Sequence, residues 1–158
     1  MQVRATALED CDALGAGMKV VVDERAWLAT EEATADELAE RFRKAIRGGE
    51  TSYVLEEEGE IVGALGTHET TPGVQYLGMW VLPAYRGRGG GRMLMEALLA
   101  DRPRDVHKIE LEVWPENEAA IALYRKLGFE EEGLRRNHYR RRDGSLRSAL
   151  IMARLFET

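Results

Sequence analysis

The sequence predicts one α/β (α+β) domain over residues 1–158, with a mixed, mostly antiparallel sheet of about seven strands and helices on both faces. Its 158 residues match the usual size of a single domain. No linker rich in proline, glycine or serine and no repeat interrupts the chain. Segments of helical and of strand periodicity alternate in the middle, while pairs of strands occupy both ends. This order favours a mixed sheet covered by helices.

The first half of the chain combines a short strand, two helices and a hairpin. The second helix has the clearest boundaries, because Thr34 suits an N-cap with Glu37 three residues later, and Gly48 follows the last turn. Two apolar runs on either side of the acidic turn at 57–60 indicate the hairpin. In order, we expect a strand at 3–6, helices at 8–22 and 34–47, and strands at 51–56 and 61–67.

The second half begins with a strand that a proline ends, and a glycine-rich turn then leads into a helix. A later strand alternates cleanly, with Ile109, Leu111 and Val113 on one face. Asn117 is suited to begin the next helix and Gly128 to end it. The expected elements are strands at 75–82, 107–114, 129–136 and 148–156, with helices after the glycines and after Asn117.

Composition excludes several classes of protein. Apolar residues make up 44% and charged residues 32%, which is typical of a globular chain. No apolar run approaches the roughly 20 residues needed to cross a bilayer, and the N-terminus lacks a signal-peptide core. Cys11 is the single cysteine, so an internal disulfide is excluded and a cytoplasmic location is expected. The net charge of −6 argues against a nucleic-acid partner, and neither a membrane partner nor a metal is expected.

The most unusual part of the sequence is a glycine cluster, residues 87–91, which joins a strand directly to a helix. Glycine lets backbone N–H groups approach a ligand closely, and a helix N-terminus favours negative charge. Arg86, Arg88 and Arg92 add positive side chains at the same place. The strand before and the helix after favour a phosphate- or pyrophosphate-binding loop over the alternative, a flexible turn.

Two common phosphate-binding motifs do not fit this cluster. A dinucleotide fingerprint that starts at Gly87 would require a third small residue where Arg92 stands. The P-loop of nucleotide-binding proteins ends in Gly-Lys-Ser/Thr, which is absent from this segment. These departures disfavour a nucleotide-dependent kinase or dehydrogenase.

A second motif lies in the predicted helix at 117–129. Alone, it describes a capped helix in which Tyr124 is a core aromatic residue. Together with the glycine cluster, it makes the chain resemble the GNAT superfamily of acetyl-CoA-dependent N-acetyltransferases over about residues 61–156. The C-terminal third is most similar to the ribosomal-protein alanine N-acetyltransferases. The residues shared with the two family motifs are Arg86, Gly89 and Gly91 in the first, and Asn117, Ala120, Leu123, Tyr124, Gly128 and Phe129 in the second.

The resemblance implies a binding site for acetyl-CoA as co-substrate. The loop amides would hold the pyrophosphate, and the backbone of the strand before the loop would bind the pantetheine arm and the thioester carbonyl. Asn117 would contact the pantetheine, and Tyr124 would protonate the departing thiolate. The residues implied in binding acetyl-CoA are Met79, Trp80, Val81, Gly87, Arg88, Gly89, Gly90, Gly91, Arg92, Asn117 and Tyr124.

Acetyl transfer needs a group that takes a proton, since a lysine-type amine has a pKa of about 10.4 and an α-amine of about 8. Glu112 is the first candidate for this base, because related alanine N-acetyltransferases carry a catalytic glutamate at the matching position. It shares a strand face with Glu110, so this face either borders a cleft or is half solvated. His68, Glu69 or a chain of water molecules are the alternatives. Cys11 is distant in sequence from both motifs, which argues against an acetyl-cysteine intermediate.

The identity of the acceptor is left open. We expect an N-acetyltransferase that moves the acetyl group directly to a primary amine, of a small molecule or a protein N-terminus, in a ternary complex. The alternative is a non-catalytic acyl-CoA-binding or regulatory module, and a homodimer is compatible with either. Residues 135–147 contain six arginines and one aspartate. They could receive an acidic partner, or pair with the acidic run at 130–132, which we favour. The region around Trp27 and residues 30–32 carries no recognisable signature.

Overall fold

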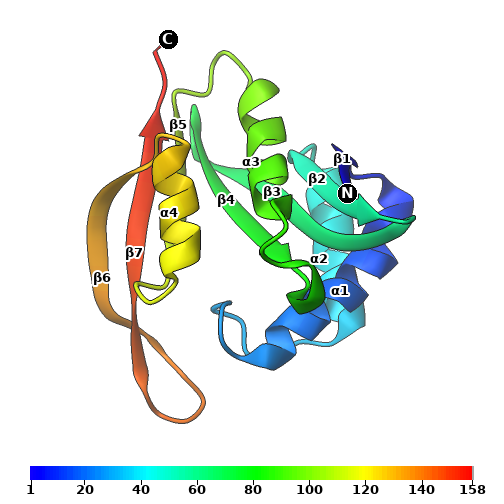
Figure 1. Cartoon of the computed structure of the whole chain (residues 1–158), viewed down its shortest axis with the longest axis horizontal. Coiled ribbons are helices and arrows are strands. Elements are labelled where there is room, and N and C mark those ends of the chain that lie inside the picture. The colour runs from blue at the N-terminus through cyan, green and yellow to red at the C-terminus, as the bar shows by residue number, and fades with distance from the viewer. Residues whose placement is uncertain (158) are drawn as a thin grey trace. The chain divides into compact units, whose positions relative to one another are not determined.

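The structure, a computed structural model that describes residues 1–157, contains a seven-stranded sheet with the strand order β1-β2-β3-β4-β5-β7-β6. β4 and β5 are parallel, whereas the pairs β1–β2, β2–β3, β5–β7 and β6–β7 are antiparallel. The predicted fold class is thus confirmed, with four α-helices beside the sheet (Figure 1). The strands are β1 (Gln2–Ala5), β2 (Ser52–Glu57), β3 (Glu60–Thr71), β4 (Val74–Val81), β5 (Lys108–Val113), β6 (Glu130–Arg140) and β7 (Leu146–Leu155). The helices are α1 (Cys11–Glu24), α2 (Ala35–Arg47), α3 (Gly90–Ala100) and α4 (Glu118–Lys126), with 3-10 turns η1 (Leu8–Asp10) and η2 (Pro83–Tyr85).

The chain forms two compact units. The first unit contains residues 1–68 and 78–102, and the second contains residues 69–77 and the chain from residue 103 on. β3 and β4 each contribute residues to both units. Within residues 1–157, no helix has the length and apolar character required to cross a membrane.

The core of the first unit lies between the helices α1 and α2 and the strands β2, β3 and β4. Gly15 allows the two helices to come close, since a Cβ at this position would lie 2.4 Å from the backbone oxygen of Ala35. The central side chains are almost fully buried, so their apolar surface stabilises the unit by roughly 25 cal/mol per Å² removed from water. They are Leu14, Val21, Val54, Ala64 and Trp80, with Met18, Leu28, Phe42, Ile61 and Leu82 packed around them.

The boundaries of α2 are those that the sequence predicts. The Thr34 hydroxyl accepts a hydrogen bond from the N–H of Glu37, and the Glu37 carboxylate accepts one from the N–H of Thr34. Two other boundaries differ. α1 begins at Cys11 because residues 8–10 form the separate turn η1. β3 continues to Thr71 through four exposed residues, whose polar side chains resemble a loop in the sequence.

The second unit has its core on one face of β5. Ile109, Leu111 and Val113 alternate into this core, as predicted, and β5 pairs with β7 along its whole length. α4 ends where Gly128 adopts a φ of +86°, a conformation that favours glycine. The side chain of Arg154 on β7 donates a hydrogen bond to the Leu127 carbonyl at 2.8 Å, which ties the end of the helix to the sheet.

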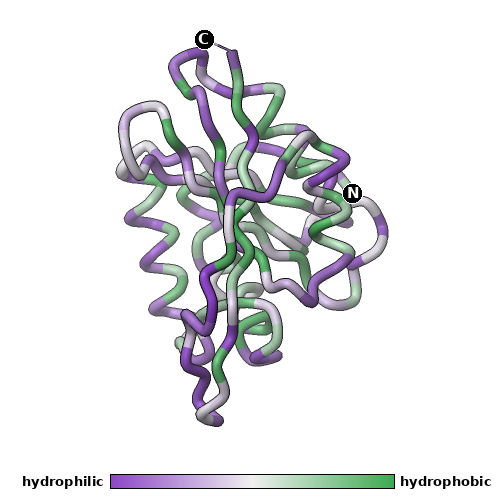
Figure 2. The backbone as a smooth tube through the Cα atoms, turned by 90° about the vertical axis from the view of Figure 1, so that its left-hand side faces the viewer, coloured by the Kyte–Doolittle hydropathy of each residue, from purple (hydrophilic) through white to green (hydrophobic). Residues whose placement is uncertain are grey.

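The β6–β7 hairpin is longer than predicted and carries an irregularity. β6 is the edge strand of the sheet, and nearly every residue in it is exposed. The register shifts between Arg135, opposite Ala149, and Tyr139, opposite Arg147. Three residues of β6, 136–138, thus lie opposite one residue of β7, Ser148, and Asn137 at the shift has a φ of +49°. The hairpin extends as a long ribbon in Figure 1, and its tip, at the lower end of Figure 2, is predominantly hydrophilic.

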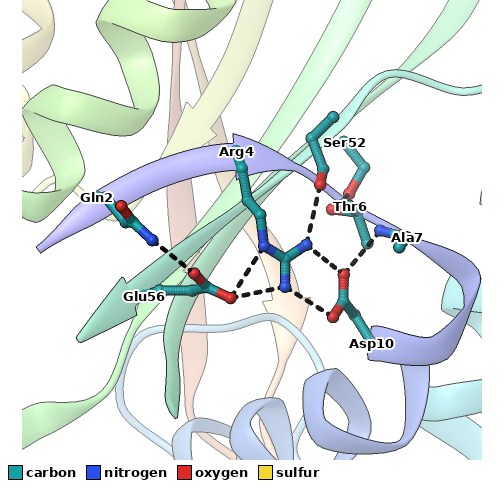
Figure 3. A network of polar contacts seen from close by, with 8 residues as sticks. Gln2, Arg4, Thr6, Ala7, Asp10, Ser52 and Glu56 are labelled. Atoms are coloured by element: carbon teal, nitrogen blue, oxygen red, sulfur yellow. Dashed lines mark hydrogen bonds and ion pairs between the residues drawn. The ribbon is translucent and has the colours of Figure 1, made fainter. Parts of the chain in front are cut away.

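An ion-pair network fastens β1 to the rest of the first unit (Figure 3). The Arg4 guanidinium donates to both oxygens of Asp10, at 2.7 and 2.9 Å, and to Glu56 at 2.9 and 2.6 Å. Asp10 also accepts from the N–H of Ala7, and Glu56 from the amide of Gln2. Hydrogen bonds from Arg4 hold the pKa of both carboxyls below their ordinary values. Arg4 thus joins a strand, a 3-10 turn and the neighbouring strand β2.

We expect R4M to lower the melting temperature at pH 7 by about 3–6 °C, because Asp10 and Glu56 lose their shared cation. Since Arg4 depresses the folded-state pKa of both carboxyls, its contribution is complete above their unfolded pKa of about 4. It disappears as the pH falls through the lower folded-state values. The difference in melting temperature between wild type and R4M should therefore shrink between pH 5 and pH 2, measured by thermal denaturation.

The matched control is K19M, which removes the exposed ion pair between Lys19 and Asp23 within α1. Such a pair contributes about 0.3–0.5 kcal/mol, so we expect a change of no more than about 2 °C. Equal effects of R4M and K19M would show that the network adds no more stability than a surface pair.

Candidate active site

The glycine-rich loop leaves the first N–H groups of α3 without partners from the helix. The first helical hydrogen bond runs from the N–H of Met93 to the carbonyl of Gly89 at 3.0 Å. No side chain caps this end. The N–H groups of residues 90–92 therefore remain as donors, at the positive end of the helix dipole. This is the arrangement that binds phosphate groups in many proteins.

Two glycines shape this loop because their backbone is left-handed. Gly87 has a φ of +75° and Gly89, the N-cap of α3, a φ of +84°. A Cβ at either position would meet no atom within 4 Å, so both face open space. Gly90 serves another purpose, since a Cβ there would lie 2.5 Å from the Leu55 side chain on β2. The loop thus combines open space in front of its amides with close packing behind them, which fits an anionic ligand.

The arginines of the loop differ in their roles. Arg86 donates to both oxygens of Glu24, at 2.8 and 2.7 Å, and to the Val81 carbonyl at 2.9 Å. Arg86 therefore braces the loop against the end of α1, and its charge is matched by a carboxylate. Arg92 pairs with Glu96 one turn along α3, and Arg88 lies over the Tyr85 ring at 5.2 Å. The amides and the helix dipole are thus the principal attraction for an anion, with Arg88 and Arg92 beside them.

The strand before the loop presents its backbone. The Trp80 side chain is buried in the core of the first unit, with its Nε1 lacking a partner among the described residues. The parallel pairing of β4 with β5 covers only three positions and ends at Tyr76 opposite Glu110. Residues 77–81 take no part in that ladder. Met79 and Val81 are half-buried on either side of Trp80, and the Val81 carbonyl accepts the hydrogen bond from Arg86.

Tyr124 and Asn117 lie on α4 in the second unit. Tyr124 is buried, and its ring packs against Phe129 with 6.0 Å between centroids. Burial raises the pKa of Tyr124 to about 12, and a nearby Tyr76 contributes to the rise. Tyr124 is therefore protonated at neutral pH. The Asn117 side-chain oxygen caps the helix by accepting from the N–H of Ala120 at 3.3 Å, and its amide nitrogen is the group left to contact a ligand.

Glu112 lies on the face of β5 opposite the core, and its side chain is 14% exposed. The Tyr139 hydroxyl donates to its Oε2 at 2.5 Å, and Arg135 lies 3.0 Å from its Oε1. Glu110 on the same face is 25% exposed, with the Lys108 Nζ at 3.7 Å. Each of the two carboxylates on this face therefore has a cationic partner, which offsets the cost of its burial.

Two tyrosines interact electrostatically with Glu112, and a third, Tyr124, interacts with one of them, Tyr76. The pKa of Tyr76 and of Tyr139 is raised to about 12, as is that of Tyr124, and burial is the largest cause in each case. The charge of Glu112 adds to the rise for Tyr76 and Tyr139. The second unit thus brings three protonated phenols and one carboxylate into the same neighbourhood. This combination can accept and donate protons at different points.

The alternative base candidates are placed less favourably. Glu69 accepts a hydrogen bond from the N–H of Gly73 at 2.9 Å, so its carboxylate stabilises the β3–β4 turn. His68 lies one residue earlier on the exposed end of β3. Cys11 is fully buried at the start of α1, and burial raises the pKa of its thiol. Glu69 thus serves the turn between two strands, and Cys11 belongs to the core.

Two members of the acidic run have cationic partners from outside the arginine cluster. Glu131 is bound by Arg125, and Glu132 by Lys108 at 2.7 Å. Two of the cluster's arginines lie over Trp114, with guanidinium carbons 5.5 and 5.3 Å from the ring centre; they are Arg141 and Arg147. An aromatic face contributes to the stability of a cation held over it, and sequence spacing does not reveal such a contact.

Three residues of the site escaped the sequence analysis as individual candidates. Tyr76 was only part of an expected strand, and Arg135 and Tyr139 were only part of the basic segment. One signal could have indicated them: Asn137 stands between the two, and asparagine tolerates the left-handed conformation that accompanies a bulge. Among residues 1–157, no group of three or more His, Cys, Asp or Glu side chains is arranged to hold a metal ion.

Residues 19–129 match the acetyltransferase (GNAT) family. N-alpha-acetyltransferase RimI of Mycobacterium tuberculosis is 39% identical over 104 residues, which cover 63% of this chain and 65% of that protein. The ribosomal protein bS18-alanine N-acetyltransferase of Escherichia coli is 47% identical over 72 residues, 45% of this chain and 48% of that protein. The matched regions thus span about half to two thirds of these relatives.

The crystal structure of ribosomal-protein-alanine N-acetyltransferase from Brucella melitensis is similar over 99% of this chain and 100% of that chain. Its TM-score is 0.89 and its identity 26%. The family match contains the whole glycine-rich loop and the α4 motif, from Asn117 through Tyr124 to Phe129. Both motifs lie in the structural context that their chemistry requires, and the chain belongs to the acetyltransferase (GNAT) family.

Proposed function

We propose that this protein transfers the acetyl group of acetyl-CoA to a primary amine, with the N-terminus of a peptide or protein as the acceptor. One observation carries the proposal: α3 begins with uncapped N–H groups behind two left-handed glycines, Gly87 and Gly89. A neutral ligand would gain little from such an end, whereas a pyrophosphate gains several charge-assisted hydrogen bonds. The family match and the three protonated phenols of the second unit support the same activity.

The first unit supplies the contacts for CoA. The amides of residues 87–92 hold the pyrophosphate, and the arginines Arg88 and Arg92 add positive charge at its edge. The backbone of Met79, Trp80 and Val81 binds the pantetheine arm in an extended conformation. The bound thioester supplies an electrophilic carbonyl and a thiolate leaving group. We assign a contact with the pantetheine to the side-chain amide of Asn117, the N-cap of α4.

Glu112 takes the first proton. The acceptor arrives as an ammonium group, and one proton passes to the Glu112 carboxylate directly or through water, which leaves a neutral amine. The nitrogen lone pair then forms the new N–C bond as the carbonyl opens. When the carbonyl re-forms, the C–S bond breaks, and Glu112 later returns its proton to solvent.

Tyr124 supplies the proton for sulfur. A thiol has a pKa of about 8.5, so transfer from a phenol of pKa about 12 to a fully formed thiolate would be uphill. We infer that the Tyr124 hydroxyl first hydrogen-bonds the sulfur as the C–S bond breaks. Proton transfer is completed as the attacking nitrogen releases its second proton, which restores Tyr124. The products are an amide, the free thiol of CoA and one proton.

An α-amine fits this site better than a lysine-type amine. Its ordinary pKa of about 8 is more than two units lower, so less free energy is needed to deprotonate it at neutral pH. The relatives named above act on alanine of a ribosomal protein or are named for α-acetylation. The net charge of −6 attracts a cationic acceptor. A buried free cysteine is compatible with a reducing, cytoplasmic location.

A thiol-release assay tests the activity directly. Purified protein is incubated with acetyl-CoA and, in parallel, with N-terminal peptides, free amino acids, polyamines and aminoglycosides, while release of CoA thiol is followed. We expect the peptides to give the highest kcat/KM, and blocking their α-amine by prior acetylation to abolish release. Acetyl-CoA binding without thiol release from any amine would favour the non-catalytic module. Release only with a small-molecule amine would leave the activity standing and overturn the acceptor class.

We expect Gly89→Ala to weaken acetyl-CoA binding by at least about tenfold. A side chain disfavours the left-handed backbone by about 1–2 kcal/mol, so the loop shifts and its amides lose their common direction. Gly59→Ala is the matched control, because Gly59 has a φ of +82° and also open space around it, in the β2–β3 turn. Thermal denaturation should show that Gly59→Ala destabilises the fold about as much as Gly89→Ala does. Calorimetric titration should show that Gly59→Ala binds acetyl-CoA with the affinity of the wild type. Equal affinities of the two variants would remove the loop from the site.

We expect Tyr124→Phe to reduce kcat by about 10²–10³-fold while the affinity for acetyl-CoA changes less than twofold. Phenylalanine keeps the packing against Phe129 and removes the proton donor. Tyr53→Phe is the control, since it also removes a half-buried hydroxyl, which donates to Asp101 at 2.9 Å in the first unit. Steady-state kinetics and calorimetry separate the two effects. A parallel loss of kcat and affinity would make Tyr124 a packing residue.

A further inference from the structure

We propose that the two oxygens of Glu112 have separate partners with separate tasks. Tyr139 is a positioning residue that fixes Oε2, and Arg135 is a displaceable cation on Oε1 whose place the ammonium group of the acceptor takes. The inference rests on the proposed role of Glu112 as base. It extends that role to two residues of the β6–β7 hairpin.

The irregularity in β6 brings both partners to the same carboxylate. In a regular antiparallel strand, alternate residues face opposite sides, and neighbours on one face are about 7 Å apart along the strand. Here the chain makes its extra loop between Arg135 and Tyr139, where Asn137 is left-handed. The N–H of Asn137 donates to the Ser148 hydroxyl on β7, which holds the bulge in place. Bulges commonly re-aim a side chain beside a functional site.

Tyr139 is suited to a fixed position. Its ring meets Trp114 edge to face, with 5.3 Å between centroids and an angle of 84°, and His138 lies against it at 4.7 Å. Trp114 is itself buried under two arginines of the hairpin. The hydroxyl therefore has little freedom, and its donation to Oε2 at 2.5 Å sets the orientation of the carboxylate. A phenol that stays protonated at neutral pH can donate throughout the reaction.

Arg135, in contrast to Tyr139, is suited to being displaced. Its side chain is 49% exposed, on the edge strand, and it reaches Oε1 from the solvent side at 3.0 Å. An ion pair with such exposure is weak, because water and salt screen it. The ammonium of an acceptor is a cation with N–H donors, like the guanidinium, so it can replace Arg135 on Oε1 without leaving the carboxylate unpaired. Once there, it lies against the atom that takes its proton.

The two partners predict opposite kinetic effects. Tyr139→Phe keeps the ring on Trp114 and removes only the hydroxyl, so we expect kcat to fall about tenfold, with an unchanged affinity for acetyl-CoA. Arg135→Gln removes the competing cation, so we expect the KM of the amine acceptor to fall about two- to fivefold. A rise in acceptor KM for Arg135→Gln would overturn the displacement.

A double-mutant cycle with Glu112→Gln separates positioning from general packing. If Tyr139 acts through Glu112, Tyr139→Phe lowers kcat in the wild-type background and has no further effect in the Glu112→Gln background. A structural role would instead lower kcat by the same factor in both. Tyr53→Phe again serves as the control, because its hydroxyl also donates to a carboxylate; its loss should reduce thermal stability and leave kcat unchanged.

A measurement on the protein without substrates tests the contact itself. The charge of Glu112 and its hydrogen bond contribute to the pKa of about 12 of Tyr139, after burial. With ¹³C-labelled tyrosine, we expect Tyr139, assigned by its absence from Tyr139→Phe, to titrate at lower pH in Glu112→Gln than in wild type, yet above 10. An unchanged titration would overturn the positioning role. Absence of thiol release from wild type with every amine would overturn the proposed function instead, and the titration would still decide the contact.

Discussion

The alternation of side chains along β5 is the constraint on which the second unit depends. Burying Ile109, Leu111 and Val113 on one face forces Glu110 and Glu112 onto the other. Carboxylates at the middle of a sheet are costly unless donors reach them, and β7, the direct neighbour, places aliphatic residues opposite both. The donors must come from elsewhere. For Glu112 they come from the next strand, β6, whose irregular stretch places a hydroxyl and a guanidinium on the carboxylate, whereas the cation near Glu110 is Lys108 of β5 itself.

The loop before α3 shows the opposite case in the first unit, where hydrogen-bond donors lack acceptors. The groups without partners there are the first N–H donors of α3. No side chain caps them, and the glycines before them face open space. The guanidinium of Arg86 could have been a counter-charge for an anion, but Glu24 and the Val81 carbonyl engage it. This pairing makes the loop rigid. A rigid set of amides binds a pyrophosphate with less loss of conformational entropy than free side chains would.

The sequence predicted the elements whose signals are local, and it missed those that depend on contacts between strands. The N-cap at Thr34, the alternation of β5 and the left-handed turn at Gly128 are each encoded within a few residues, and the structure has them as expected. The hydrogen-bond partner of Glu112 is not encoded locally, because the register of β6 against β7 decides which hydroxyl reaches the carboxylate. Likewise, the contacts of Arg141 and Arg147 with Trp114 join residues that are distant in sequence, so no local pattern predicts them.

Burial keeps the phenols of the second unit protonated at neutral pH. It raises the pKa of Tyr76, Tyr124 and Tyr139 to about 12, since a phenolate is poorly solvated there. All three phenols therefore stay donors at neutral pH. Glu112, which is ion-paired with the exposed Arg135, is the carboxylate that accepts the hydrogen bond of the Tyr139 hydroxyl. In the proposed mechanism, the first proton of the amine therefore passes to Glu112, whereas the proton given to sulfur comes from a phenol. In that mechanism Tyr124 regains its proton from the attacking nitrogen, so the phenol relays a proton from nitrogen to sulfur and is protonated again when the products leave.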